Sequence, residues 1–483
     1  MEVWPYALTV SEPSCDAAQP NCKGGNMSDT RNSHQKMSRR SFLHAMALGA
    51  GGAALAACVV PEGAMPAAEE AAAPPQENLP IIYWSMFGLQ EAAQAQNQVE
   101  RFNEQTGENA IFMSIGWGNV TQKAQVAIQG GNPPDMVSLW SQAYTWGPRG
   151  LLLPLEDYAE RDGFDGEGWS KPAWEALWSD GHLWGTGHTL NVFALHSNDT
   201  LMEEGGFSAD SPPETFADLD VMAEALTTFD DDGNITRLGF LPWLRSGSLW
   251  HWGWANGAQF YDEDTDTITA GSEEALLYTL EWFKSYADKY DIEKIDRYVS
   301  GFGNRSSLTE DPWYVDLIVL QIDGSWKRSW IPRYAPDLDY SVFKSPYGPG
   351  YNEPTSLVEI GAMFNVPNGA KNPEGGWQLA HFMAGKQQQI EFGNLVGDVP
   401  PLNEAARDPE FLNSLPFNEL YVELTESTGG RAWPRIPVLE QYKTEIRRLQ
   451  DEVIHGQIDP QQGLDDMTAK LQQELNDFRQ QVG

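Results

Sequence analysis

Apolar residues follow two different periods along residues 79–483. Short apolar runs at 81–84, 110–115 and 135–139 have the length and composition of buried β-strands. Segments with apolar residues every three or four positions follow these runs, and the first such segment ends just before Gly107, a residue suited to a helix C-terminus. Strands that alternate with helices of ten or more residues predict α/β domains.

Further helices are predicted nearer the C-terminus. Thr215 and Asp218 have the spacing of a capping box, which predicts a helix that runs through Leu226. Ser272 is predicted to cap another helix. Two final helices, one on each side of Gly456, should each bury one apolar face. The residues of those faces are Leu439, Tyr442, Ile446, Leu449 and Val453, and then Leu464, Met467, Leu471, Leu475 and Phe478.

The first eighty residues have a different character. Arg39 and Arg40 form a twin-arginine signal, and the apolar run that follows them is too short for a permanent membrane span. The run ends in Leu-Ala-Ala-Cys58, which resembles a bacterial lipobox, the motif in which the cysteine becomes the lipid-bearing first residue. We therefore predict a leader over residues 1–57, a lipid on Cys58 and a disordered tether over 58–78.

Composition narrows the class of partner. The formal net charge of −38 argues against a nucleic-acid partner and against a polybasic membrane-surface protein. Three cysteines do not make a disulfide framework, and the scattered histidines form no metal-binding motif, so no cofactor or metal is expected. The chain has 19 tryptophans, and aromatic side chains often form platforms where flat ligands bind.

Short motifs occur in a fixed order along the body of the chain. Taken together they resemble the motifs of the bacterial extracellular solute-binding proteins of the sugar type (family 1), the receptors of ABC importers. The segment 180–186 departs from its family motif at His182, Trp184 and Thr186. The matching segments are Gly130–Val137, Gly150–Leu155, Asp180–Thr186, Pro213–Leu219, Asp323–Trp326, Asn372–Trp377, Gly397–Pro401 and Gly456–Asp466.

The resemblance implies an α/β, two-lobe fold of the periplasmic-binding-protein type (type II), with a cleft between the lobes and hinge crossings. The first lobe is expected to comprise residues 79–190 and 345–398, and the second lobe residues 191–344 and 399–483. The chain is expected to cross between lobes near 190–192, 340–344 and 399–401.

The resemblance also implies a function. The expected protein is a monomeric, non-enzymatic receptor, exported and anchored by its lipid to the outer face of the cytoplasmic membrane. It would capture a carbohydrate, most simply an oligosaccharide, and close around it by hinge motion before delivery to the permease subunits of an ABC transporter.

Candidate ligand-binding residues follow from the chemistry of a sugar. A pyranose ring buries its apolar face on an indole, and its hydroxyl rim needs donors and acceptors. The dense cluster at 243–254 should place at least one aromatic ring against the ligand, but the sequence leaves open which one. The candidates are Trp326, Trp140, Trp84, Asn191, Trp243, Arg245, Trp250, Trp433 and Arg435.

Two alternatives stay open at this point. The same fold could bind another solute, such as a polyol phosphate or a polyamine, and a polyamine suits the acidic charge. The chain could also be an exported carbohydrate-degrading enzyme, because its many carboxylates leave a glycosidase pair possible.

Overall fold

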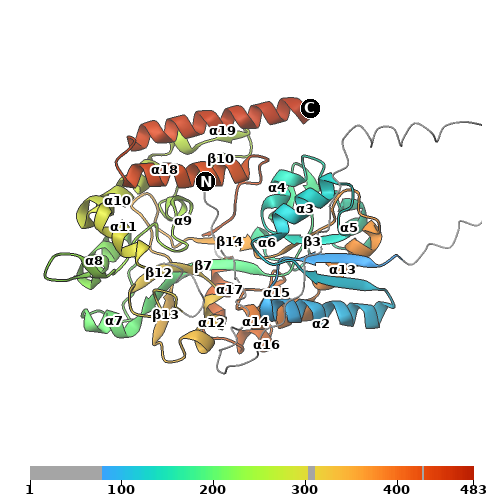
Figure 1. The fold of residues 1–483 in the computed structure, drawn as a ribbon, viewed down its shortest axis with the longest axis horizontal. Helices are drawn as coiled ribbons and strands as arrows, with labels where there is room; N and C mark the ends of the chain where they lie inside the picture. The colour runs from blue at the N-terminus through green and yellow to red at the C-terminus, as the bar shows by residue number, and fades with distance from the viewer. Residues whose placement is uncertain (1–78, 303–309, 427–428, 483) are drawn as a thin grey trace, which may run out of the picture. The chain divides into compact units, whose positions relative to one another are not determined.

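The computed structural model describes residues 79–302, 310–426 and 429–482. The predicted leader, the lipidated Cys58 and the tether lie outside the described residues. Residues 78–483 form one compact unit, and the fold below is that of its described part (Figure 1). Within these ranges, no helix combines the length and the apolarity needed to cross a bilayer.

The first lobe is built on a five-stranded sheet in the order β2-β1-β3-β15-β6. β1 runs parallel to β2 and β3, whereas β15 runs antiparallel to β3 and β6. The strands are β1 (Ile81–Ser85), β2 (Ala110–Ser114), β3 (Met136–Leu139), β6 (Thr186–Gly187) and β15 (Met363–Asn365). The main helices of this lobe are α2 (Leu89–Thr106), α3 (Val120–Gln129), α4 (Gln142–Trp146), α5 (Glu156–Asp162), α6 (Lys171–Glu175), α13 (Pro373–Met383) and α14 (Lys386–Val396).

The second lobe is built around β7 (Leu190–Asn198), a strand of nine buried residues. β7 pairs antiparallel with β12, β13 and β14, and β14 pairs parallel with β16. These strands are β12 (Leu320–Gly324), β13 (Tyr340–Phe343), β14 (Ser356–Ile360) and β16 (Gly430–Arg431). The main helices are α7 (Asp199–Glu204), α8 (Phe216–Leu226), α9 (Leu249–Ala255), α10 (Glu274–Tyr290), α11 (Ile292–Ser300), α12 (Lys327–Tyr334), α17 (Asn418–Glu426), α18 (Leu439–Ile454) and α19 (Pro460–Val482).

The chain changes sheet between β6 and β7, at residues 188–189, and again between β14 and β15, at residues 361–362. A third connection follows α14, where Val399 forms a bridge with Leu190. The segment 340–344 was expected to cross between lobes, but β13 stays paired with β7 along that stretch because its register continues the same sheet. The exact division of residues between the lobes remains a prediction.

Most of the elements predicted from periodicity are confirmed. α2 ends at Gly107, which adopts a left-handed φ of 78°, and Thr215 with Asp218 forms the capping box of α8. α18 and α19 bury the two predicted apolar faces. The cap predicted at Ser272 is wrong: Ser272 closes a short 3₁₀ turn, its hydroxyl donates to the carbonyl of Thr269, and Glu273 is the N-cap of α10.

Candidate functional site

A narrow pocket of about 10 Å³, too small as it stands for a sugar ring, lies between the two sheets and draws residues from both lobes. One side follows the carboxyl end of β3 and the start of α4, and the other is formed by β14 and the segment after β16. Ligands of open α/β sheets bind at such strand ends. The lining residues are Trp140, Ser141, Tyr144, Ala176, Val358, Glu359, Ile360, Met363, Ala432 and Trp433.

The wall from the first lobe is aromatic. Trp140 stacks on Trp117, with ring centroids 5.4 Å apart and an interplanar angle of 27°. Phe87 meets Trp117 edge to face at 5.3 Å. Trp117 is 40% exposed and lies outside the set of residues that line the pocket, so it extends the indole surface of Trp140 toward solvent. Trp140 was predicted from its position after a strand; Trp117 follows the strand at 110–114 in the same way, and that signal could have found it.

The wall from the second lobe centres on Trp433. Its ring meets Trp250 edge to face at 5.1 Å and lies 5.8 Å from Trp254. Nζ of Lys443 lies 4.1 Å from the centroid of the Trp433 ring. Trp250 and Trp254 are themselves buried, so they support Trp433 from behind. Of the tryptophans in this wall, Trp433 is the one that lines the pocket.

The polar group of the pocket is the carboxylate of Glu359. Strand pairing sets Glu359 directly opposite Asn191, and Nδ2 of Asn191 donates to Oε1 of Glu359 at 3.1 Å. Nε1 of Trp433 donates to the other oxygen, Oε2. The carboxylate is therefore held in place by two donors, one to each of its oxygens, and still has lone pairs available to a ligand.

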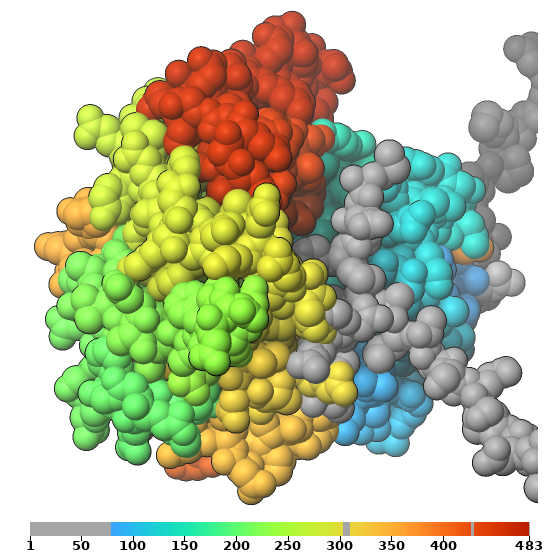
Figure 2. Space-filling view, turned by 60° about the vertical axis from the view of Figure 1, so that its left-hand side comes forward, coloured from blue at the N-terminus to red at the C-terminus, as the bar shows by residue number. Residues whose placement is uncertain are grey.

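A polar contact joins the lobes next to the pocket. Ser141 accepts a hydrogen bond from Nζ of Lys443 at 2.6 Å, and it donates to Oε1 of Glu440 at 3.0 Å. Ser141 belongs to the first lobe, whereas Lys443 and Glu440 lie on α18. Figure 2 shows the C-terminal segment in red beside the yellow part of the second lobe. The hydrogen bond from Arg149 to the carbonyl of Pro437, at 2.8 Å, joins this segment to the first lobe.

Trp326 and Trp84 lie outside the set of residues that line this pocket. Trp326 precedes α12, where its half-buried ring meets Phe193 edge to face at 5.4 Å. The same ring lies against Gly324, because a Cβ atom on Gly324 would come within 2.1 Å of it. Trp84 is half-buried on β1 and packs against the main core. Their contact with a ligand remains a prediction.

The tryptophans at 250–254 occupy a helix, α9, so they point in different directions. Trp252 is fully buried and packs against Phe216 and Trp282 on the far side of α9 from Trp433. Trp243 is half-buried and lies 6.0 Å from Phe283.

The two predicted arginines both form ion pairs. Arg245 adopts a left-handed φ of 61°, and its guanidinium lies 2.6 Å from Asp311 in a cluster that also holds the buried Lys327. Arg435 pairs with Glu263 at 2.8 Å, and its Nη1 donates to the carbonyl of Glu175 in the first lobe. Arg435 therefore joins the two lobes at the edge of the site.

A buried acid marks the third connection between the lobes. Oδ1 of Asp398 accepts a hydrogen bond from Ser325 at 2.7 Å. Burial raises the pKa of the Asp398 carboxyl to about 7, against the lowering effects of Ser325 and of the Arg328 guanidinium. Arg328 is fully buried, and it donates to the carbonyls of Gly397 and Pro416.

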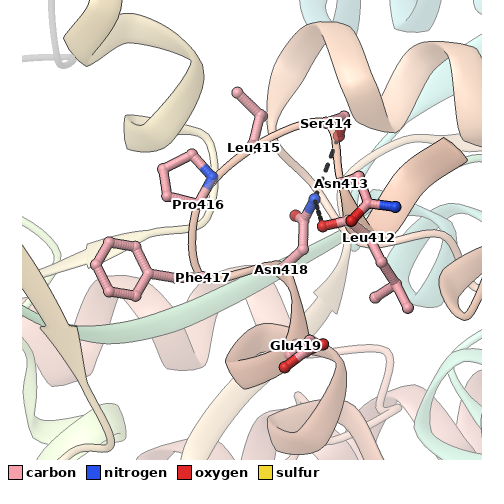
Figure 3. Close-up of a pocket in the computed structure, with 8 residues that line it drawn as sticks. All are labelled: Leu412, Asn413, Ser414, Leu415, Pro416, Phe417, Asn418 and Glu419. Carbon is pink, nitrogen blue, oxygen red and sulfur yellow. Dashed lines mark hydrogen bonds between the residues drawn. The ribbon is translucent and has the colours of Figure 1, made fainter. Parts of the chain in front are cut away.

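A second hollow is formed by a single loop, residues 412–419 (Figure 3). The amide of Asn418 lies inside this loop and donates to the carbonyl of Phe411 at 2.6 Å and to the hydroxyl of Ser414 at 3.2 Å. The loop thus uses its central polar group for its own structure. In the described part of the chain, no group of three or more His, Cys, Asp or Glu residues is placed to hold a metal.

Known proteins share this architecture. The mannobiose-bound structure of CpMnBP1 superimposes with a TM-score of 0.72 at 23% identity, covering 82% of this chain and 100% of that one. The maltotriose-bound MalE domain of Bdellovibrio bacteriovorus gives a TM-score of 0.66 at 18% identity, covering 82% of this chain and 100% of that one. At these identities the similarity establishes the two-lobe fold.

Sequence comparison gives the family. A binding protein of Brucella abortus strain 2308 is 21% identical over 374 residues, which cover 76% of this chain and 86% of that protein. Residues 97–416 match the family described as bacterial extracellular solute-binding protein. With this match across most of the two-lobe body, the chain belongs to the bacterial extracellular solute-binding protein family.

Proposed function

We propose that this chain is the lipid-anchored, extracytoplasmic substrate-binding component of an ABC importer. It captures a carbohydrate, most simply an oligosaccharide, in the pocket between its lobes and closes around it by hinge motion. The captured sugar then passes to permease subunits, and the binding protein itself catalyses no reaction.

The observation that carries this proposal is the pairing of an indole from each lobe around one carboxylate. Trp140 and Trp433 line the same pocket, and Glu359 lies with them. Indole faces suit the apolar side of a pyranose, and an acceptor such as Glu359 suits its hydroxyls. A micromolar Kd needs about −8 kcal/mol, which two aromatic platforms and a satisfied set of hydrogen bonds can supply.

The ligands of the structural relatives support the same class. CpMnBP1 holds mannobiose in one structure and mannotriose in another, and the GacH receptor of Streptomyces glaucescens is described with acarbose. These ligands are short, hydroxyl-rich carbohydrates. We infer the same chemical class here from the aromatic walls of the pocket.

A ligand panel tests the proposal directly. The exported protein is titrated with mannobiose, mannotriose and maltotriose, with thermal unfolding as the measurement. Ligand at about 100 times its Kd stabilises the folded state by about 2.7 kcal/mol, which raises the melting temperature. We expect at least one oligosaccharide to do so and to be recovered intact. Cleavage of the bound sugar would instead favour an exported carbohydrate-degrading enzyme.

A polyamine is the second candidate, and a specific observation favours it. The net charge is −38 and the pocket contains a carboxylate, both of which attract an oligocation. Spermidine and putrescine therefore belong in the same panel. Stabilisation by either amine, with none by any sugar, would replace the carbohydrate assignment and leave the receptor role intact.

The anchor has its own test. Lipidation of Cys58 would place the protein in the membrane fraction of cells that express the full chain, and Cys58→Ser should release it into the soluble extracytoplasmic fraction. Equal membrane association of the two forms would contradict a lipid on this residue.

A further inference from the structure

The geometry points to Glu359 as the residue that selects neutral over acidic saccharides. This inference rests on the proposed function and makes it more specific. It concerns the charge class of the ligand, which neither the fold nor the aromatic walls determine, because an indole accepts the apolar face of a neutral sugar and of a uronic acid equally well.

The carboxylate of Glu359 has a fixed position in the pocket. Both oxygens of Glu359 accept a hydrogen bond, one from Asn191 and one from Trp433. These two donors come from β7 and from the segment after β16, so the carboxylate cannot turn away from the pocket without losing one of them. A ligand that binds between Trp140 and Trp433 meets this charge.

The carboxylate of Glu359 can bind only ligand groups that donate a hydrogen bond. An ionised carboxylate is an acceptor only, so its remaining lone pairs need a donor on the ligand. Hydroxyl groups meet that need. A carboxylate or phosphate on the ligand supplies no donor and adds a like charge in a partly buried site, where repulsion is stronger than in water.

The cationic side chains near the pocket are already paired with carboxylates of the protein. Among the described residues that line the pocket there is no lysine or arginine. Lys443, at the edge, donates to Ser141, lies over the Trp433 ring and is 3.6 Å from Glu440. Arg435 is paired with Glu263. Each of these charges is already balanced by a carboxylate of the protein, so an acidic ligand gains little from them.

Matched ligand pairs test the inference. The affinities of mannobiose, mannotriose and maltotriose are measured by calorimetry beside those of the same sugars oxidised at C6 to uronates. We expect each neutral sugar that binds to do so at least about tenfold more tightly than its uronate. We expect Glu359→Gln to narrow that ratio by about tenfold, because the neutral amide removes the repulsion.

A charge control and a second measurement separate selectivity from stability. Glu374→Gln removes the same charge from α13, where Glu374 pairs with Arg161 at 2.8 Å, and it should leave the ratio unchanged. In the unaltered protein, added salt should also narrow the ratio, since salt screens repulsion. This second measurement does not depend on the folding of any variant.

The outcomes are distinct. A uronate that binds the unaltered protein as tightly as its neutral counterpart overturns the inference and leaves the proposed function standing. A ratio that Glu359→Gln and salt both leave unchanged also overturns it. Failure of every neutral and acidic sugar to bind overturns the carbohydrate assignment of the proposed function together with this inference.

Discussion

Asn191 and Glu359 face each other across strands β7 and β14, and the amide of Asn191 donates to the carboxylate at 3.1 Å. β7 begins at residue 190, and β14 ends at residue 360, so both side chains lie beside the points where the chain changes sheet. In the proposed function, a ligand group on Glu359 would contact the junction between the lobes, so binding and hinge closure would involve the same two residues.

The amide of Asn191 should support ligand binding through Glu359. Asn191→Ala removes one of the two donors that fix the carboxylate, and we expect the affinity for the sugar identified in the panel to fall about tenfold, the equivalent of about 1.4 kcal/mol. Calorimetry measures the change. Asn368→Ala, which removes an exposed amide that donates to Gly150, is the matched control and should bind normally.

The exposed indole of Trp117 should contribute to binding with little effect on folding. Trp117→Ala is expected to weaken the sugar about tenfold and to change the free energy of unfolding by less than about 1 kcal/mol, since the ring is 40% exposed. Trp252→Ala should show the opposite pattern, with a loss of about 3–5 kcal/mol of stability, because that ring is fully buried. Urea unfolding and calorimetry on both variants separate the two effects. Full affinity in Trp117→Ala would remove this residue from the site.

Gly361 leaves room for the hinge side chains. A Cβ atom on Gly361 would lie 2.6 Å from Oδ1 of Asn191 and 2.7 Å from Oγ1 of Thr189, so both side chains have to move. We expect Gly361→Ala to displace Asn191 and to weaken sugar binding severalfold, with a stability cost of about 1 kcal/mol.

Two controls make the Gly361 experiment specific. A Cβ atom on Gly88 would have no neighbour within 4 Å, so Gly88→Ala should bind sugar like the unaltered protein, with a loss of about 1 kcal/mol of stability because Gly88 is the N-cap of α2. Because the effect of Gly361→Ala acts through Asn191, it should be much smaller when Asn191 is already alanine. Additive losses in the double variant would show that Gly361 acts by another route.

Asp398 should make stability depend on pH. Its pKa is raised from the ordinary 3.8 to about 7 by burial, so the folded state holds a proton that the unfolded state releases between about pH 4 and 7. Stability from this group is therefore present at low pH and is lost as pH rises, by up to about 1.4 kcal/mol per pH unit. Asp398→Asn, which stays neutral, should match the unaltered protein at about pH 3, below the pKa of the unfolded carboxyl, and exceed it in stability at about pH 8.

The comparison with Asp398→Asn is needed because buried histidines act in the opposite direction. Burial lowers the pKa of His188 to about 3 and that of His196 to about 4, so acid destabilises the fold through both. These contributions are the same in the two proteins and cancel in the difference. Urea unfolding at several pH values gives that difference, and parallel curves would contradict a raised pKa at Asp398.

Much of the architecture follows from local sequence. Helices α2, α18 and α19 were predictable because their buried residues recur at helical spacing. Trp140 was predictable because it follows a strand that the pattern shows clearly. These features depend on neighbours in the chain, which the sequence displays directly.

The polar part of the site depends on distant partners. Glu359 acquires its position from Asn191, which is 168 residues away, and from Trp433. Strand partners so far apart have no local signature. Arg245 was a ligand candidate for the same reason: its partners Asp311 and Asp323 come from other segments, and they hold it in an ion cluster.

The contacts of Arg328 constrain how the lobes can rotate. The guanidinium of Arg328 donates to the carbonyls of Gly397 and Pro416 and to the side chain of Asn418. It therefore ties the connection at residues 397–399 to the loop ahead of α17. In the proposed hinge motion, residue 397 is therefore expected to move little. The axis of rotation is then expected to pass close to Gly397, and the largest displacements should occur at the rim farthest from it.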